Sequence, residues 1–147
     1  MFKKVLILLT LVVSAYLTGC ATVPMATEEQ DLARKEFASP EQDSAGLYIY
    51  RNSTLGGALK KNVYIDGDFI AETAPMTYFY LVIKPGVHML STESEFSDNS
   101  LELDAESGQN YFVRQYIKLG VFVGGANLEL VPEEEGKEGV LECKLAN

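Results

Sequence analysis

From residue 46 onward, apolar and polar positions alternate in short runs that Gly, Asn, Asp and Pro separate. Successive side chains of a strand point to opposite faces, so runs with a period of two predict strands that turn one face toward a core. The runs are rich in β-branched and aromatic residues, which strands favour. Eight runs fit this pattern, at residues 46–51, 62–66, 69–73, 77–83, 88–94, 100–104, 111–117 and 126–131.

Short strands at this spacing predict an all-β fold, an antiparallel β-sandwich of about seven to eight strands. Three stretches rich in turn residues are expected to form hairpin turns between them: Asp66-Gly67-Asp68, Pro85-Gly86 and residues 105–110. Residues 120–125 are interrupted by glycines and fit either an edge strand or a loop.

A short helix is predicted before the first strand. Thr27, with Gln30 three positions later, has the pattern of a capping box, and Leu32 and Phe37 would give the helix a narrow apolar face that ends before Pro40. Such a helix could dock on a partner, or it could pack on its own domain or be frayed. Because isolated helices of this length are marginal, we favour the second interpretation, packed or frayed.

Residues 132–145 fit two structures. Pro132 followed by three glutamates suits the first turn of a helix, where proline loses no hydrogen bond and acidic groups complement the helix dipole. The alternation of Leu141, Cys143 and Leu145 fits a final strand equally well, and two glycines in the segment weaken a helix. Both alternatives stay open, and in either one Cys143 is expected to be a buried small hydrophobic residue.

The first residues have the pattern of a secretory signal. Lys3 and Lys4 precede a run of apolar and small residues from Val5 to Leu17. This run is shorter than the roughly 20 apolar residues that a membrane-spanning helix needs. We therefore expect residues 1–19 to be a signal peptide.

The charge of the remaining chain is strongly negative. Without Lys3 and Lys4, 10 Lys and Arg stand against 21 Asp and Glu, a formal charge of −11. Adjacent cations occur at Arg34-Lys35 and at Lys60-Lys61. Such a surface repels nucleic acid, so no nucleic-acid partner is expected.

Few residues could carry catalysis. His88 is the only histidine and could act as a general base with Ser91 or Asp66. A lone histidine on an alternating strand is more often structural, and neither a second histidine nor a cysteine pair offers a zinc site. Asp66 and Asp68 are too few for an EF-hand calcium loop. We expect no enzyme, no catalytic residue and no metal; the alternative is a small periplasmic hydrolase or enzyme inhibitor that uses His88.

Tyrosines are frequent on the expected strands. Their rings could form a platform that stacks on peptidoglycan sugars or on a peptide. Tyrosine suits core edges and cross-strand pairs equally, and we favour this structural interpretation. The residues are Tyr48, Tyr50, Tyr64, Tyr78, Tyr80, Tyr111 and Tyr116.

The sequence "LTGC" (17–20), which closes the apolar run, resembles the lipobox of bacterial lipoproteins. The resemblance implies that the thiol of Cys20 carries a diacylglycerol group, that the leader is cut before Cys20 and that the new amino group is acylated. Two or three acyl chains anchor a protein stably. Ala21 stands where Asp would resemble an inner-membrane signal, so the resemblance implies the outer membrane, facing the periplasm, in a Gram-negative host. A Cys20–Cys143 disulfide is the less favoured alternative.

Residues 20–44, with many charged and few large apolar side chains, are expected to be a lipidated spacer with limited structure. The following part, Ala45 to Leu145, resembles small bacterial lipoproteins with a domain of unknown function. The similarity lies in "YIYR" (48–51), "V-x-I-D-G" (63–67), "P-G-x-H" (85–88) and "G-Q-x-Y-F" (108–112). The order of the second and third motifs is also similar to surface-layer sandwich modules thought to bind the cell envelope.

These resemblances imply a lipid-anchored protein whose non-catalytic domain, residues 45–147, binds or stabilises a periplasmic or envelope partner, either a protein or peptidoglycan. The candidate binding or structural residues are Arg51, Asp66 and His88. Arg51 ends an expected strand and is easily paired with an acid such as Asp66, in which case a structural ion pair is the favoured interpretation.

Overall fold

The computed structural model describes residues 21–94, 99–118, 120 and 124–147. Each of the eight expected strands is present, with bounds within two residues of those predicted. In chain order the elements are α2 (Glu28–Arg34), β1 (Ala45–Arg51), β2 (Lys61–Ile65), β3 (Asp68–Thr73), β4 (Thr77–Ile83), β5 (Gly86–Thr92), β6 (Asn99–Ala105), β7 (Asn110–Lys118), β8 (Gly125–Val131), α3 (Glu133–Leu141) and β9 (Lys144–Leu145).

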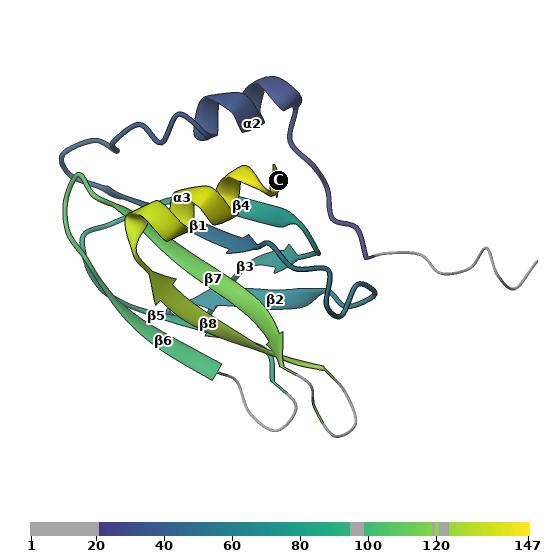
Figure 1. The fold of residues 1–147 in the computed structure, drawn as a ribbon. Helices are drawn as coiled ribbons and strands as arrows, with labels where there is room; N and C mark the ends of the chain where they lie inside the picture. Colours follow the sequence, from purple (N-terminus) through teal and green to yellow (C-terminus); the bar gives the residue numbers. More distant parts are fainter. Residues whose placement is uncertain (1–20, 95–98, 119, 121–123) are drawn as a thin grey trace, which may run out of the picture.

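The strands form two sheets that pack face to face, with both helices on the outer side of the larger sheet (Figure 1). The five-stranded sheet has the order β8-β7-β1-β4-β9, and the four-stranded sheet has the order β3-β2-β5-β6. The predicted all-β sandwich with a helix near each end is confirmed. Among the described residues, neither helix has the length and apolarity needed to cross a bilayer.

Strand β1 lies at the centre of the molecule, and all seven of its residues are buried. Its inward face, with Leu47 and Ile49, packs against the four-stranded sheet in the main core. Its outward face, with Tyr48 and Tyr50, packs beneath the helices in a second cluster that includes Val140 of α3. Because both faces are covered, the molecule has three layers rather than two.

Most neighbouring strands are antiparallel, but two pairs are parallel. Strand β1 pairs with β7 in parallel from Gly46↔Asn110 to Tyr50↔Arg114, and β4 pairs in parallel with β9. Strands β5 and β6, which lie in the opposite sheet, come between β4 and β7 in the chain. After this crossover β7 runs beside β1 in the same direction.

The three expected turns differ in what they connect. Asp66 and Gly67 have φ values of 54° and 88°, which fit a two-residue hairpin loop between β2 and β3, as predicted. The prediction of hairpins at Pro85-Gly86 and at residues 105–110 is wrong, because both segments carry the chain from one sheet to the other. Turn residues reverse the chain but do not specify which sheet receives the next strand. Of the expected edge strand or loop at 120–125, residues 121–123 lie outside the described part.

The segment expected to be a spacer packs against the sandwich. Val23 is buried beside Ala74 and Phe79, and Met25 forms an antiparallel bridge with Ala146. The first described residue is also held, since the amide of Ala21 donates to the carbonyl of Gly57 at 2.8 Å. The low apolar content of the segment hid this packing, because much of it is made by backbone hydrogen bonds.

Helix α2 begins with the predicted capping box: the Thr27 hydroxyl accepts from the amide of Gln30, and the Gln30 side chain accepts from the amide of Thr27. The helix packs on its own domain, which is one of the two outcomes expected for so short a helix. The expected apolar face is only partly right, because Leu32 is 61% exposed. Polar contacts hold the helix instead: Asp31 accepts from the amide of Leu145 at 3.0 Å, and Lys35 donates to the carbonyl of Cys143 at 2.6 Å.

The C-terminal segment contains both alternatives in succession, since α3 ends at Leu141 and β9 follows at Lys144. Two glycines of α3 lie where the helix approaches the sheet most closely: a methyl group at Gly136 would overlap Phe112, and one at Gly139 would overlap the ring of Tyr50. Cys143 is buried, as predicted, and burial raises the pKa of its thiol to about 12.

Candidate binding site at the open edge of β4

The structure brings Asp66 and His88 together. His88, on β5, lies with its Nδ1 2.7 Å from Oδ2 of Asp66 in the β2–β3 turn. The Nε2 of His88 lies 2.8 Å from the carbonyl oxygen of Lys84. The other carboxylate oxygen of Asp66 accepts from the amide of Met89 at 2.8 Å, so the turn is fastened to β5 by side chain and backbone.

The surroundings of His88 favour its charged form. Both ring nitrogens face oxygen atoms that only accept hydrogen bonds, so both are best protonated. The contacts with Asp66 and with the carbonyl of Lys84 raise the pKa of His88, and the hydrogen bonds from Met89 and His88 lower the pKa of Asp66. An imidazolium has no lone pair to take a proton, which makes this geometry unsuited to a general base.

Ser91, the other expected partner of His88, is three positions away on the same strand. Residues at an odd separation on a strand point to opposite faces, so Ser91 and His88 do not form a pair. The contacts of His88 therefore have a structural role: they hold the β2–β3 turn against β5. Among the described residues, no group of three or more His, Cys, Asp or Glu is arranged to hold a metal ion.

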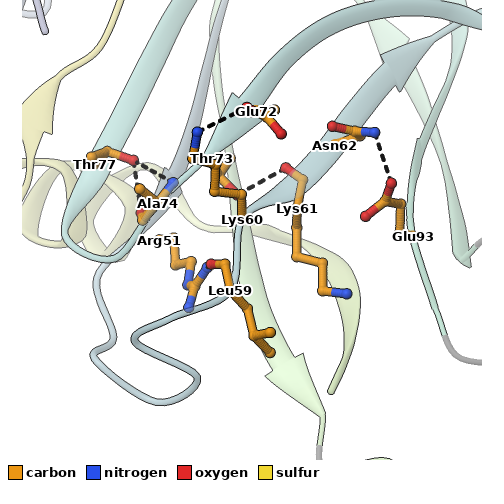
Figure 2. Close-up of polar contacts among 10 residues, drawn as sticks. All are labelled: Arg51, Leu59, Lys60, Lys61, Asn62, Glu72, Thr73, Ala74, Thr77 and Glu93. Carbon is orange, nitrogen blue, oxygen red and sulfur yellow. Dashed lines mark hydrogen bonds and ion pairs between the residues drawn. The ribbon is translucent and has the colours of Figure 1, made fainter. Parts of the chain in front are cut away.

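Arg51 does not pair with Asp66, and that prediction is wrong. Its side chain is fully buried, and its two terminal nitrogens donate to three carbonyl oxygens: Leu55 and Gly56 at 2.9 Å and Leu59 at 2.8 Å. Figure 2 shows the guanidinium beside Leu59. Burial lowers the pKa of Arg51. Arg51 therefore organises the loop at 52–60, while Asp66 is engaged elsewhere.

Three of the seven tyrosines of the expected platform cannot reach a ligand, while the other four are half-buried. Tyr48, Tyr50 and Tyr78 are at most 1% exposed, because the helices cover this face of the sheet. Tyr48 stacks on Phe112 at a centroid distance of 5.0 Å, and the pKa values of Tyr48 and Tyr50 are raised to about 12 by burial. These tyrosines form a core, which was the favoured interpretation.

A buried polar network that the sequence pattern did not predict connects the two sheets. Gln115 of β7 donates to the hydroxyl of Thr92 of β5 at 2.7 Å and accepts from the hydroxyl of Thr73 of β3. Thr92 also donates to the carbonyl of Asn62 at 2.8 Å. Alternation placed all three residues on inward faces, but it could not show that their polar groups would meet.

Strands β3, β6 and β8 each form one edge of a sheet, and the edge beyond β4 is the one that two hollows flank. Strand β9 covers β4 only at Thr77 and Tyr78. There the amide of Ala146 donates to the carbonyl of Tyr78 at 2.8 Å, so the backbone groups of Tyr78 point away from β1. Because this direction alternates along a strand, the N–H and C=O groups of Tyr80 and Val82 also point outward. In the described part of the chain no strand pairs with them.

Two hollows flank this open edge. One, of about 400 Å³, lies between α2, the C-terminus and the edges of both sheets. The other, of about 600 Å³, continues past Tyr80 toward the loop after α2. The guanidinium of Arg34 lies 4.2 Å from the centre of the Tyr80 ring and borders both hollows. The first hollow is mainly apolar, with Ala33, Ile70, Ala71, Phe79 and Leu81 in its lining.

This arrangement can accept an extended peptide. An added strand would hydrogen-bond to the outward groups of Tyr80 and Val82, while alternate side chains would enter the hollows. Val82 is 62% exposed, so the edge is accessible. The sequence predicted β4 with its bounds but could not show that β9 ends after two residues.

Comparison with known proteins adds a family and a relative. A family model described as "Protein of unknown function (DUF2846)" matches residues 41–126. An "Uncharacterized protein" of Haemophilus influenzae (strain ATCC 51907 / DSM 11121 / KW20 / Rd) is 57% identical over 134 residues, which are 91% of this chain and 80% of that protein. No solved structure shows a significant match.

Proposed function

We propose that this chain, which belongs to the DUF2846 family of proteins of unknown function, is a lipid-anchored binding protein of the bacterial envelope and has no catalytic activity. Its acyl chains are carried by Cys20 and hold it in the outer membrane, facing the periplasm. It binds an extended segment of a periplasmic or envelope protein along the open edge of β4. It uses no metal and no cofactor besides the covalent lipid.

The open edge of β4 is the observation on which the binding role rests. The C-terminal residues of the chain already add a short parallel strand at Thr77 and Tyr78, so this edge is suited to strand addition. A peptide bound at Tyr80 and Val82 would continue that pairing along the same strand. The occupant is a peptide rather than a sugar chain, because the edge offers backbone groups at strand spacing beside an apolar hollow.

Support for a non-catalytic role comes from His88. Both of its ring nitrogens are engaged, with Asp66 and with Lys84, so the geometry disfavours the alternative of a hydrolase or inhibitor that uses His88 as a base. Support for the anchor comes from the sequence "LTGC" (17–20), which resembles a lipobox and ends at Cys20.

Replacement of the cysteine tests the anchor. In the Cys20→Ala variant we expect loss of fatty-acid labelling and either a soluble product or an unprocessed precursor that keeps the leader 1–19. A Cys143→Ala variant is the matched control and should stay lipidated and membrane-bound. A mature Cys20→Ala protein, cut before residue 20, that still partitions with membranes would overturn the anchoring.

A photo-crosslinking amino acid at Val82 tests the binding site. Val87 on β5 has the same exposure, 62%, and serves as the matched control position. We expect crosslinks in intact cells to a discrete periplasmic or envelope protein from position 82 and none from position 87. Equal crosslinking from both positions, or crosslinks from 82 to peptidoglycan only, would contradict peptide binding at this edge.

The backbone of the edge can be tested as well. Val82→Pro removes an N–H group that points away from β1 and therefore leaves the pairing with β1 intact. Val82→Thr keeps the N–H group and the branched shape. We expect loss of the crosslinked partner in pull-downs with Val82→Pro and retention with Val82→Thr; equal recovery by both would exclude strand addition at Val82.

A further inference from the structure

The first described residue of the chain is fixed to one loop of the sandwich. The amide of Ala21 donates to the carbonyl of Gly57 at 2.8 Å, in the loop 52–60 between β1 and β2 (Figure 1). The packing continues along the segment: Val23 is 8% exposed, and the amide of Ala26 donates to the carbonyl of Leu145 at 3.0 Å. No spare length of chain lies between position 21 and the folded domain.

This attachment has a geometric consequence for the anchor. Cys20 is covalently bonded to Ala21, and neighbouring Cα atoms are about 3.8 Å apart. Acyl chains on the thiol of Cys20 would therefore enter the bilayer within about 10 Å of Gly57. A protein anchored in this way cannot move away from the membrane on a tether, so its loop 52–60 must lie at the bilayer surface.

The chemistry of this end of the molecule fits such a surface. Leu55 is 50% exposed at the tip of the loop. The adjacent lysines Lys60 and Lys61 follow it, with Lys60 in an exposed contact with Glu72 at 3.3 Å (Figure 2). Lys118 is exposed at the end of β7, next to Ile117, which lies beside Gly56. Arg51, with its three carbonyl partners, keeps the loop in one conformation.

Cationic side chains at this end are available to anionic headgroups. The chain has 21 acidic residues, so most of its surface would be repelled by anionic headgroups. The other adjacent cations, Arg34 and Lys35, contact Tyr80 and Asp31. Around loop 52–60, Lys60 and Lys118 are exposed and Lys61 is half-buried, and Lys60 can exchange its exposed contact with Glu72 for a lipid phosphate.

We propose that loop 52–60 is a membrane-facing surface: the anchored protein rests on the bilayer with Leu55 in the headgroup region and with Lys60, Lys61 and Lys118 over lipid phosphates. This inference rests on the proposed lipid anchor at Cys20. It gives the molecule a fixed orientation. Strand β1 ends at the loop, so its start at Ala45 and the nearby Val82 of β4 lie about 20 Å from the loop. Val87 also lies far from the loop, five residues along β5 from Thr92, which pairs with Val63 near the loop end of β2. The open edge of β4 then faces the periplasm.

Nitroxide labels on the acylated full chain test this orientation. The labels are placed at Leu55→Cys and, as a control of similar exposure at the other end, at Val87→Cys; the remaining thiol, Cys143, is buried. The protein is reconstituted in vesicles of phosphatidylethanolamine and phosphatidylglycerol. We expect a water-soluble nickel complex to reach the Leu55 label several-fold less in vesicles than in a soluble Cys20→Ala protein made without the leader 1–19, and to reach the Val87 label equally in both. Equal accessibility of both labels in vesicles would overturn the inference.

Two controls separate this inference from the anchor itself. Flotation of the acylated chain with the vesicles tests the anchor: a chain that neither carries acyl groups nor floats overturns the proposed anchoring, and the orientation with it. A chain that floats while its Leu55 label stays as accessible as in solution overturns the orientation alone. A flexible Gly-Ser spacer inserted between Cys20 and Ala21 should restore access to the Leu55 label, and unchanged shielding would contradict a role for the short connection.

Discussion

A carboxylate oxygen of Asp66 lies 2.7 Å from Nδ1 of His88, although the two residues are 22 positions apart in the sequence. The contact joins the "V-x-I-D-G" segment to the "P-G-x-H" segment, so two patterns that are separate in the sequence form one structural unit. It ties the tip of the β2–β3 hairpin to β5.

The titration of His88 is expected to reveal this contact. Because His88 is the only histidine, its NMR resonance can be followed in the intact protein. We expect a pKa above the ordinary value of 6.5, and Asp66→Asn should return it toward that value, since the largest cause of the rise is the hydrogen bond to Asp66. Asp68→Asn, in the same turn, is the control and should leave the titration unchanged. A His88 pKa at or below 6.5 in the unchanged protein would exclude the contact in solution.

Stability is expected to depend on pH through the same pair. The folded protein raises the pKa of His88, so this stabilisation is complete below the unfolded pKa and is lost as pH rises through the folded value. Asp66 has a lowered pKa, so its contribution is lost at acid pH instead. Denaturant unfolding should therefore show a fall in the free energy of unfolding as the pH rises above the ordinary histidine pKa of 6.5. His88→Gln should remove this fall, and the same pH slope in both proteins would contradict the assignment.

Arg51 is expected to be important for stability although it forms no ion pair among the described residues. Arg51→Met would leave three carbonyl oxygens of loop 52–60 without a buried donor, and we expect a loss of about 2–4 kcal/mol in the free energy of unfolding. Arg114→Met is the matched control: Arg114 pairs with Glu129 and Glu135 at the surface, so its loss should cost less than about 1 kcal/mol. Chemical denaturation of both variants measures the difference, and equal losses would contradict the role of Arg51.

The Gln115 network should show strong coupling between its members. Thr92→Val leaves the Gln115 amide without its buried acceptor, and we expect a loss of about 1–3 kcal/mol. Adding Gln115→Leu to Thr92→Val removes the unpaired amide and should recover part of this loss. A double-mutant cycle from urea unfolding measures the coupling, and strictly additive effects would exclude it.

Gly136 and Gly139 of α3 are expected to resist substitution. Alanine normally stabilises a helix relative to glycine by up to about 1 kcal/mol. Here the new methyl groups would overlap Phe112 and the Tyr50 ring, so each Gly→Ala change should instead destabilise the protein by about 1–3 kcal/mol. Glu134→Ala, on the exposed side of α3, should change stability by less than about 0.5 kcal/mol. Thermal unfolding of the three variants tests this, and a gain in either glycine variant would show that the helix lies farther from the sheet.

Some of these features follow from local patterns. The eight main strands, the Thr27 capping box, the hairpin at Asp66-Gly67 and the burial of Cys143 depend on neighbours within a few residues, and alternation or spacing is sufficient to predict them. Local patterns do not reveal which sheet receives the strand after a turn, which is why the hairpin predicted at Pro85-Gly86 is wrong.

The amino-acid sequence is sufficient to locate the main strands and to assign each side chain to one of the two faces of its strand, because side-chain periodicity is a property of the local backbone. Packing of the sheets and helices establishes which faces are covered and which polar groups meet: helices bury Tyr48 and Tyr50, Arg51 binds carbonyls rather than Asp66, and β9 pairs with β4 only at its first two residues. These outcomes depend on contacts between residues far apart in the chain. Their energies exist only once the sheets and helices are packed together.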